Sequence, residues 1–84
     1  MVVRDVIVKN RLGLHARVVT LVVKKASKFK SDIFIEFNGK KANGKSIINV
    51  LALGANCGAK VKITVSGPDE MLALDEMAAV FDQE

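Results

Sequence analysis

Lys60-Val61-Lys62-Ile63-Thr64-Val65-Ser66 is the stretch of this sequence that decides its fold. Three β-branched apolar residues alternate with polar ones, and a period of two places all of the apolar side chains on one face of a strand. Such alternation is typical of an antiparallel sheet with one buried face and one face in water. The sequence therefore predicts a sheet that needs a covering layer on one side only.

Three further segments predict the remaining strands. Residues 2–8 are rich in β-branched residues, which favour extended backbone. Residues 32–37 alternate in polarity, and Asn38-Gly39 follows them as a strong hairpin signal. Residues 40–43 are therefore expected to form a short strand that pairs back onto residues 32–37.

A helical period begins at Ala16. Apolar residues then recur at spacings of three and four, which predicts a helix with one buried stripe. Lysines crowd its C-terminal end, where positive charge suits the helix dipole. The expected stripe is Val18, Val19, Val22, Val23, Ala26 and Phe29.

Two more helices are expected later in the chain. Ser46 can cap a short helix over residues 47–53, and Gly54 can end it. Gly67-Pro68-Asp69-Glu70 is typical of a helix start, because proline and acidic residues suit the first turn. The buried stripe of this last helix is expected to be Met71, Leu74, Met77, Ala78 and Phe81.

The elements therefore follow the order strand, helix, strand, strand, helix, strand, helix. This order predicts an α+β fold, a two-layer open-faced β-sandwich in which three helices cover one face of a four-stranded antiparallel sheet. Residues 1–84 are expected to form one domain, since 84 residues are too few for two cores.

Composition excludes several classes of protein. The single cysteine, Cys57, cannot form an intrachain disulfide and is read as an incidental free thiol, and one histidine cannot make a His-rich metal site. No apolar run is long enough for a transmembrane span, and the N-terminus does not resemble a signal peptide. We expect a soluble cytoplasmic protein without metal or cofactor. Its 13 Lys and Arg against 9 Asp and Glu, a net charge of +4, suggest an anionic partner.

The chemistry concentrates in Gly13-Leu14-His15-Ala16-Arg17, where loop gives way to helix. The start of a helix offers unpaired backbone N–H groups and partial positive charge to an anion, and the guanidinium of Arg17 suits phosphate oxygens. A neutral imidazole is also a nucleophile. The segment therefore suits a transient phosphohistidine at His15. From the spacing alone, however, a histidine that merely caps the helix or lies on the surface is the commoner case.

Two segments together resemble HPr, the histidine-containing phosphocarrier of the bacterial phosphoenolpyruvate:sugar phosphotransferase system. Gly13-Leu14-His15-Ala16-Arg17 is similar to the active-site motif of that family. Gly39-Lys40, Lys45-Ser46-Ile47-Ile48-Asn49-Val50 and Leu53-Gly54 resemble the surroundings of its regulatory serine. Length and element order agree as well, so the resemblance extends over essentially the whole chain.

The resemblance implies a carrier rather than an enzyme. His15 would accept a phosphoryl group on Nδ1 from phosphorylated enzyme I and pass it to an enzyme IIA domain. Arg17 would stabilise the transferring group, and the backbone N–H groups of Ala16 and Arg17 would cradle it. A carrier that shuttles between partners is expected to be a monomer, to bind no nucleic acid and to insert into no membrane.

Ser46 has two interpretations. From the sequence alone it is an ordinary helix cap. The resemblance implies phosphorylation by an HPr kinase/phosphorylase and, in turn, binding to a catabolite-control transcription regulator. Asn49 stands where glycine is common in lineages that have this kinase, which weakens the regulatory interpretation.

A partner surface is expected beside His15. The short helix is apolar almost all round, so part of it should stay exposed. Its expected contact residues are Ile47, Ile48 and Leu51, ringed by Arg17, Thr20 and Lys24. A purely structural role in the core is the alternative for the apolar three.

The chain departs from the family motif after Arg17, where proline or alanine and then a small residue are usual but Val18 and Val19 follow here. Val18 restores an N–H and adds bulk near the site. Three other functions stay open: a carrier in a nitrogen-regulating phosphotransferase branch, a regulatory-only HPr-like binding protein, and a small nucleic-acid-binding domain. The last is disfavoured because the chain has no Trp or Tyr for base stacking and no RNP-type motif.

Overall fold

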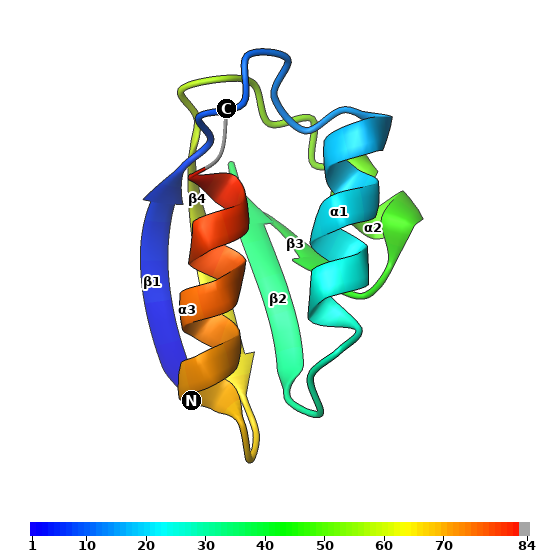
Figure 1. Ribbon diagram of the computed structural model, residues 1–84. Coiled ribbons are helices and arrows are strands. Elements are labelled where there is room, and N and C mark those ends of the chain that lie inside the picture. The colour runs from blue at the N-terminus through cyan, green and yellow to red at the C-terminus, as the bar shows by residue number, and fades with distance from the viewer. Residues whose placement is uncertain (83–84) are drawn as a thin grey trace.

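The predicted strands pair into one antiparallel sheet with the order β1-β4-β2-β3. The computed structural model describes residues 1–82 (Figure 1). Its strands are β1 (Val2–Ile7), β2 (Asp32–Phe37), β3 (Lys40–Asn43) and β4 (Lys60–Ser66). The strand with the clearest alternation, β4, lies inside the sheet between β1 and β2.

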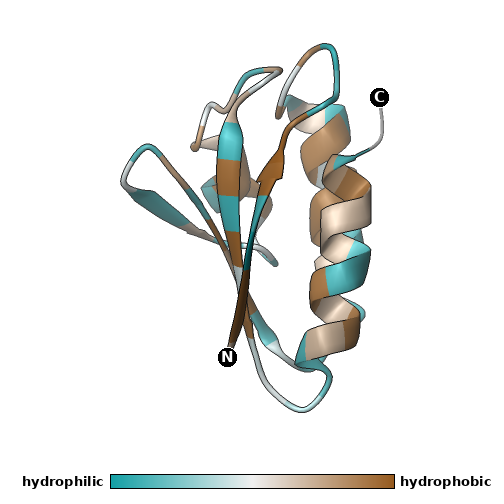
Figure 2. Cartoon of the chain, turned by 90° about the vertical axis from the view of Figure 1, so that its left-hand side faces the viewer, coloured by the Kyte–Doolittle hydropathy of each residue, from teal (hydrophilic) through white to brown (hydrophobic). Residues whose placement is uncertain are grey.

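Three helices complete the fold: α1 (Ala16–Ala26), α2 (Ile47–Leu51) and α3 (Glu70–Phe81). The two longer helices, α1 and α3, lie across one face of the sheet (Figure 1). Seen from the side, the sheet and α3 form two separate layers (Figure 2). The short helix α2 packs against α1 and β3. The predicted two-layer open-faced sandwich is therefore confirmed.

The core follows the alternation of the strands. Ile63 of β4 is paired with Ile35 of β2, and both side chains are fully buried. Burial of each such side chain contributes roughly 1.5–3 kcal/mol. The helices meet these strands with Val19, Val22 and Met77, all of them fully buried, so one contiguous core joins the two layers.

The other face of the sheet is open. Phe34 of β2 is half-buried there, and Lys41 Nζ lies 4.4 Å from the centroid of its ring. Phe29 and Phe81 are buried in the core, and Phe37 packs against it. The open face therefore presents one aromatic ring already covered by a lysine, which makes it a poor platform for stacked bases.

Several helices and strands end earlier than the sequence predicts. Helix α1 ends at Ala26, whereas the sequence pattern continued to Phe29. Phe29 is nevertheless buried, because the loop after α1 turns its side chain back into the core. The structure likewise ends β1 at Ile7 instead of residue 8 and α2 at Leu51 instead of residue 53. In each case an apolar residue is buried from a loop, which periodicity cannot distinguish from burial within the element.

The predicted stripe of α3 is wrong at Met71, which is 55% exposed. Ala73 is buried instead, together with the correctly predicted Leu74, Met77 and Phe81. Ala78 is half-buried. Helix α3 packs against β1, β4 and α1, and Met71 lies outside the buried residues of this helix, because apolar character alone does not decide burial.

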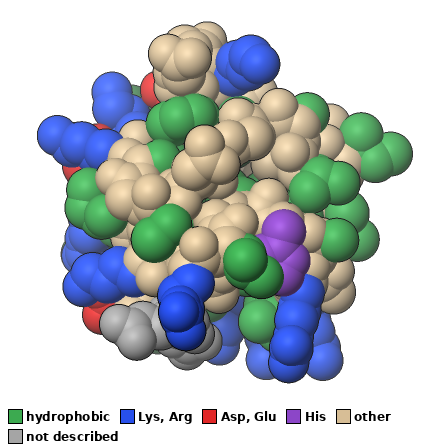
Figure 3. Space-filling model, turned by 90° about the horizontal axis from the view of Figure 1, so that it is seen from above, with side chains coloured by type: hydrophobic (Ala, Val, Ile, Leu, Met, Phe, Trp, Pro, Cys, Tyr) green, Lys and Arg blue, Asp and Glu red, His purple; other side chains and the backbone are tan. Residues whose placement is uncertain are grey.

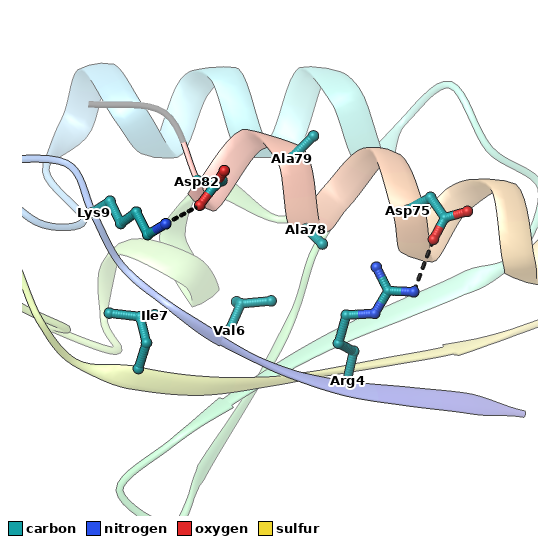
Figure 4. A pocket seen from close by; sticks show the side chains of 8 residues that line it. All are labelled: Arg4, Val6, Ile7, Lys9, Asp75, Ala78, Ala79 and Asp82. Carbon is teal, nitrogen blue, oxygen red and sulfur yellow. Dashed lines mark hydrogen bonds and ion pairs between the residues drawn. The ribbon is translucent and has the colours of Figure 1, made fainter.

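The edge strand β1 is fastened to α3 by ion pairs, with a shallow hollow between them (Figure 4). Arg4 Nη2 lies 2.8 Å from Asp75 Oδ1, and Lys9, just beyond β1, pairs with Asp82. Exposed pairs of this kind stabilise a fold by at most about 1 kcal/mol each. These ion pairs orient the edge strand, whereas burial of its apolar side chains stabilises its attachment to the core.

The start of α3 is fixed in a way that the sequence did not predict. Asp69 occupies the N-cap position, but its carboxylate makes no cap hydrogen bond. It accepts hydrogen bonds from the hydroxyl and backbone N–H of buried Ser31 and from the backbone N–H of Lys30. The hydrogen bond from the Ser31 hydroxyl, followed by that from the Lys30 amide, holds the pKa of Asp69 below its ordinary value.

Replacement of Asp69 by Asn is expected to lower the Tm by several degrees at pH 7, because an amide NH₂ would face groups that are themselves donors. A carboxyl whose pKa is lower in the folded state stabilises the fold fully above its unfolded pKa of about 4 and loses this effect as the pH falls further. The Tm difference between wild type and Asp69→Asn should therefore shrink in acid. Thermal melts at pH 7 and pH 3 test this, with the exposed Asp32→Asn as the matched control. Equal Tm values at pH 7 would contradict the assignment.

Candidate functional site

A tight turn leads into α1. The Asn10 carbonyl accepts a hydrogen bond from Gly13 N at 3.0 Å, and the Asn10 side chain accepts one from Leu12 N at 3.1 Å. Asparagine stabilises turns through this kind of local hydrogen bond. The turn therefore holds Arg11 and Leu12 at its tip, directly before the site.

Gly13 allows this turn to approach a second loop closely. Its φ is +70°, and a Cβ added there would lie 2.7 Å from the Ala55 carbonyl oxygen and 2.8 Å from Asn56 Cα. The next residue, Leu14, is buried and donates its N–H to the Ala55 carbonyl at 2.9 Å. These contacts fix the position of His15 relative to the core.

His15 is the N-cap residue of α1. Its Nδ1 accepts a hydrogen bond from the backbone N–H of Arg17 at 3.3 Å, and its carbonyl accepts one from Val19 N at 2.9 Å. Since Nδ1 is the acceptor, this arrangement requires its lone pair to be free of a proton. The ring is half-buried, on the surface of this end of the molecule (Figure 3). The structure thus directs one nitrogen of the imidazole at the positive end of a helix.

The charges around His15 have one sign. The first turn of α1 contains no acidic residue, and the Arg17 side chain is exposed. A group of basic side chains lies next to the imidazole on one side (Figure 3). An anion bound to Nδ1 would therefore meet backbone N–H groups and a nearby guanidinium.

Sequence reasoning missed a hollow of about 720 Å³ beside the imidazole. It is lined by Asn10, Arg11, Leu12, His15, Arg17, Val18 and Leu21. Leu12 and Leu21 are 75% and 51% exposed. A signal was present, since Leu21 is an apolar residue of α1 that falls outside the buried stripe.

The predicted contact residues of α2 are exposed, as expected: Ile47 by 47%, Ile48 by 78% and Leu51 by 42%. Ser46 caps α2, with its Oγ accepting a hydrogen bond from Asn49 N at 3.4 Å. The helix is attached to the core by Val50, which is fully buried. The exposed apolar side chains of α2 thus point away from the core.

Two predicted contact residues of α1, Thr20 and Lys24, are also exposed. The Thr20 hydroxyl donates a hydrogen bond to the Ala16 carbonyl at 2.8 Å. Lys24 lies one turn further along and lines a groove with Lys28. Val18 and Val19, the residues that depart from the family motif, are both buried, so most of their bulk is in the core, although Val18 also reaches the wall of the hollow.

Residues 1–82 lack two kinds of feature, a membrane-spanning helix and a metal-binding cluster. Within that range no helix is long and apolar enough to cross a membrane. The same residues contain no cluster of three or more His, Cys, Asp or Glu side chains that could hold a metal ion.

A histidine that caps a helix, on a two-layer antiparallel sandwich of this topology, matches the class of small phosphocarrier proteins. The family described as "PTS HPr component phosphorylation site" matches residues 2–83. The chain is 43% identical over 81 residues to phosphocarrier protein HPr of Treponema pallidum, covering 96% of this chain and 92% of that one. It therefore belongs to the HPr family.

Two further similarities agree with this assignment. The chain is 40% identical over 84 residues to the HPr-like protein Crh of Bacillus subtilis, covering 100% of this chain and 99% of Crh. It superimposes on a crystal structure of HPr from Bacillus anthracis with a TM-score of 0.91 at 40% identity, over 94% of each chain. The fold and the family are thus supported by sequence and structure alike.

Gly13→Ala is expected to destabilise the protein by more than the roughly 1–2 kcal/mol that a left-handed backbone costs a residue with a Cβ, because the new methyl group would also collide with the 55–56 backbone. Gly39→Ala is the matched control, since Gly39 has a φ of +79° but no atom within 4 Å of an added Cβ. Denaturant unfolding measures both, and NMR shifts of the His15 ring report its displacement. The prediction is wrong if the two variants lose the same stability.

Proposed function

We propose that this protein carries a phosphoryl group on His15 Nδ1, accepting it from phosphorylated enzyme I and passing it to enzyme IIA domains. The observation that carries the proposal is the hydrogen bond from Arg17 N to Nδ1, because it directs the lone pair of this nitrogen toward the positive end of α1, where a phosphoryl group would be stabilised. Membership in the HPr family supports the same assignment.

The proposed transfer uses this geometry. The Nδ1 lone pair attacks phosphorus, the bond to the donor breaks, and its electron pair leaves with the donor. The Arg17 N–H, which now binds Nδ1, becomes available to a phosphoryl oxygen, and the Ala16 N–H lies in the same first turn of α1. The Arg17 guanidinium supplies charge where negative charge spreads over the transferring oxygens.

The same geometry suits release. The ring is half-buried rather than enclosed, so a partner can approach the phosphoryl group. Beyond His15 and Arg17 the proposal requires no catalytic side chain of this chain, since the donor and the acceptor proteins supply the rest of each transfer. The protein therefore acts as a carrier and not as an enzyme. We propose that it is a monomer and that it is located in the cytoplasm, where it would bind enzyme I and enzyme IIA.

Incubation with phosphoenolpyruvate and the enzyme I of the same organism tests this proposal. Wild type should gain the mass of one acid-labile phosphoryl group, and His15→Ala should gain none. Arg17→Gln should remain a substrate but react about 10²-fold more slowly, as when one stabilising group of a transition state is removed. Lys62→Gln is the matched control, since it removes one positive charge from an exposed position on the open face of the sheet. Labelling of His15→Ala to the wild-type level would refute the site.

Ser46 is proposed as a regulatory phosphorylation site. Its Oγ is at the cap of α2, next to the exposed apolar side chains of that helix. A phosphoserine would add about two negative charges there, which would repel an acidic partner. A kinase of the HPr kinase/phosphorylase type and a catabolite-control transcription regulator would be the corresponding partners. The proposed contact surface comprises Arg17, Thr20, Lys24, Ile47, Ile48 and Leu51.

Ser46→Asp is expected to slow phosphoryl transfer from enzyme I about tenfold through charge repulsion. Asp can also cap a helix, so the variant should keep nearly wild-type stability. Ser46→Ala should show the reverse pattern, with normal transfer but about 1 kcal/mol less stability because the cap is lost. Transfer kinetics and urea unfolding of both variants separate the two roles. Unchanged transfer to Ser46→Asp would leave Ser46 as a cap only.

A regulatory-only role is the second candidate, favoured by the full-length similarity to Crh. Structures of Crh include a swapped dimer, at a TM-score of 0.79 and 40% identity over 98% of this chain and 94% of that chain. Absence of phosphoryl transfer to wild type from a competent enzyme I would favour this candidate. A carrier in a nitrogen-regulating branch would instead be phosphorylated but would not serve the sugar-specific acceptors.

A further inference from the structure

The hollow beside the imidazole contains a second guanidinium that the proposed transfer does not use. Arg11 lines it together with His15 and Arg17, although Arg11 lies on the turn and Arg17 lies on α1. Leu12, Val18 and Leu21 give the same hollow an apolar wall. We propose that Arg11 is a docking residue, which pairs with a carboxylate of the phosphoryl-donating protein while an apolar side chain of that protein enters the hollow.

The position of Arg11 is preorganised. Its turn is closed by two hydrogen bonds to Asn10 and is anchored by Gly13 and Leu14 against the 55–56 loop. A cation on so rigid a turn loses little backbone entropy when it binds. Arg11 therefore differs from a charge on a mobile loop.

The charge around the hollow is unbalanced. Its lining includes two arginines and no carboxylate. Among the residues that the structure describes, Arg4, Lys25 and Lys60 each pair with an acid, whereas Arg11 forms no ion pair. An unpaired cation on a partly apolar wall is complementary to an acidic residue next to an apolar one.

The positive strip continues along α1. Leu21 lines both this hollow and the next groove, in which Lys24, Lys25 and Lys28 are exposed or half-exposed. No α2 residue lines either of them. The partner would thus contact His15 from the side of the turn as well as from the side of α2, and Arg11 would add contacts beyond the proposed surface.

This inference rests on the proposed phosphoryl transfer and adds a specificity-determining contact to it. Because Arg11 is assigned to docking rather than to the reacting atoms, its loss should weaken association with the donor and leave the chemical step intact. In kinetic terms, KM for transfer should rise while kcat stays constant.

The test measures KM and kcat for transfer from the phosphorylated enzyme I of the same organism. Arg11→Glu should raise KM about tenfold or more, and Arg11→Gln less, with kcat within about twofold of wild type. Lys62→Glu makes the same charge change on the open face of the sheet and should leave KM within about twofold. High salt should narrow the difference between Arg11→Glu and wild type, because it screens the ion pair. Leu12→Ala should raise KM several-fold at every salt concentration. Circular dichroism melts verify that all variants fold.

Three results would overturn the inference. An equal rise in KM for Lys62→Glu would show that only net charge matters. A fall in kcat with unchanged KM would place Arg11 at the reacting group instead of at a docking contact. If wild type is phosphorylated and Arg11→Glu has the same KM and kcat as wild type, only the docking role of Arg11 is refuted. If wild type is not phosphorylated at all, the proposed function is refuted, and the docking role of Arg11 is refuted with it.

Discussion

The close approach of Gly13 to the 55–56 loop is the constraint on which the functional end of this protein depends. No side chain fits between them, since an added Cβ would lie within 2.8 Å of the opposite backbone. Beside this contact Leu14 is buried, and His15 caps the helix that follows. Backbone packing thus positions the imidazole at the start of α1, where its Nδ1 accepts a hydrogen bond from the backbone N–H of Arg17.

The surroundings of His15 combine two properties that usually conflict. Cationic groups would favour a bound anion, whereas half-exposure of the ring would keep that anion accessible and the local field partly screened. In the proposed function, such a site would bind a phosphoryl group without burying it. The exposed leucines and isoleucines around it would be a liability in an isolated protein, but they would suit the brief contacts with larger partners that the proposed carrier role requires.

Much of the fold could be predicted because β2 and β4 alternate in polarity and a hairpin signal follows β2. Ile35 and Ile63 lie on the buried face, and Ser46 caps the short helix, as the sequence indicated. The errors have one cause. Periodicity indicates which side chains prefer burial but not the shape of the surface that they meet, so it predicts Met71 in the core and extends α1 to Phe29, which is buried from a loop. The sequence predicts an ordinary helix start at Asp69, because its hydrogen-bond partner Ser31 is 38 residues away.

The sequence by itself determined the sheet, the order of the elements and the identity of His15 and Arg17 as the residues of interest, because alternation, capping residues and a local motif are all short-range signals. Only the tertiary structure decided which nitrogen of the imidazole faces the helix, and that Arg11, Leu12 and Leu21 share one hollow with it. Those facts depend on how a turn, a helix and a distant loop pack together. Packing is a property of three-dimensional distances, and local spacing along the chain does not encode it.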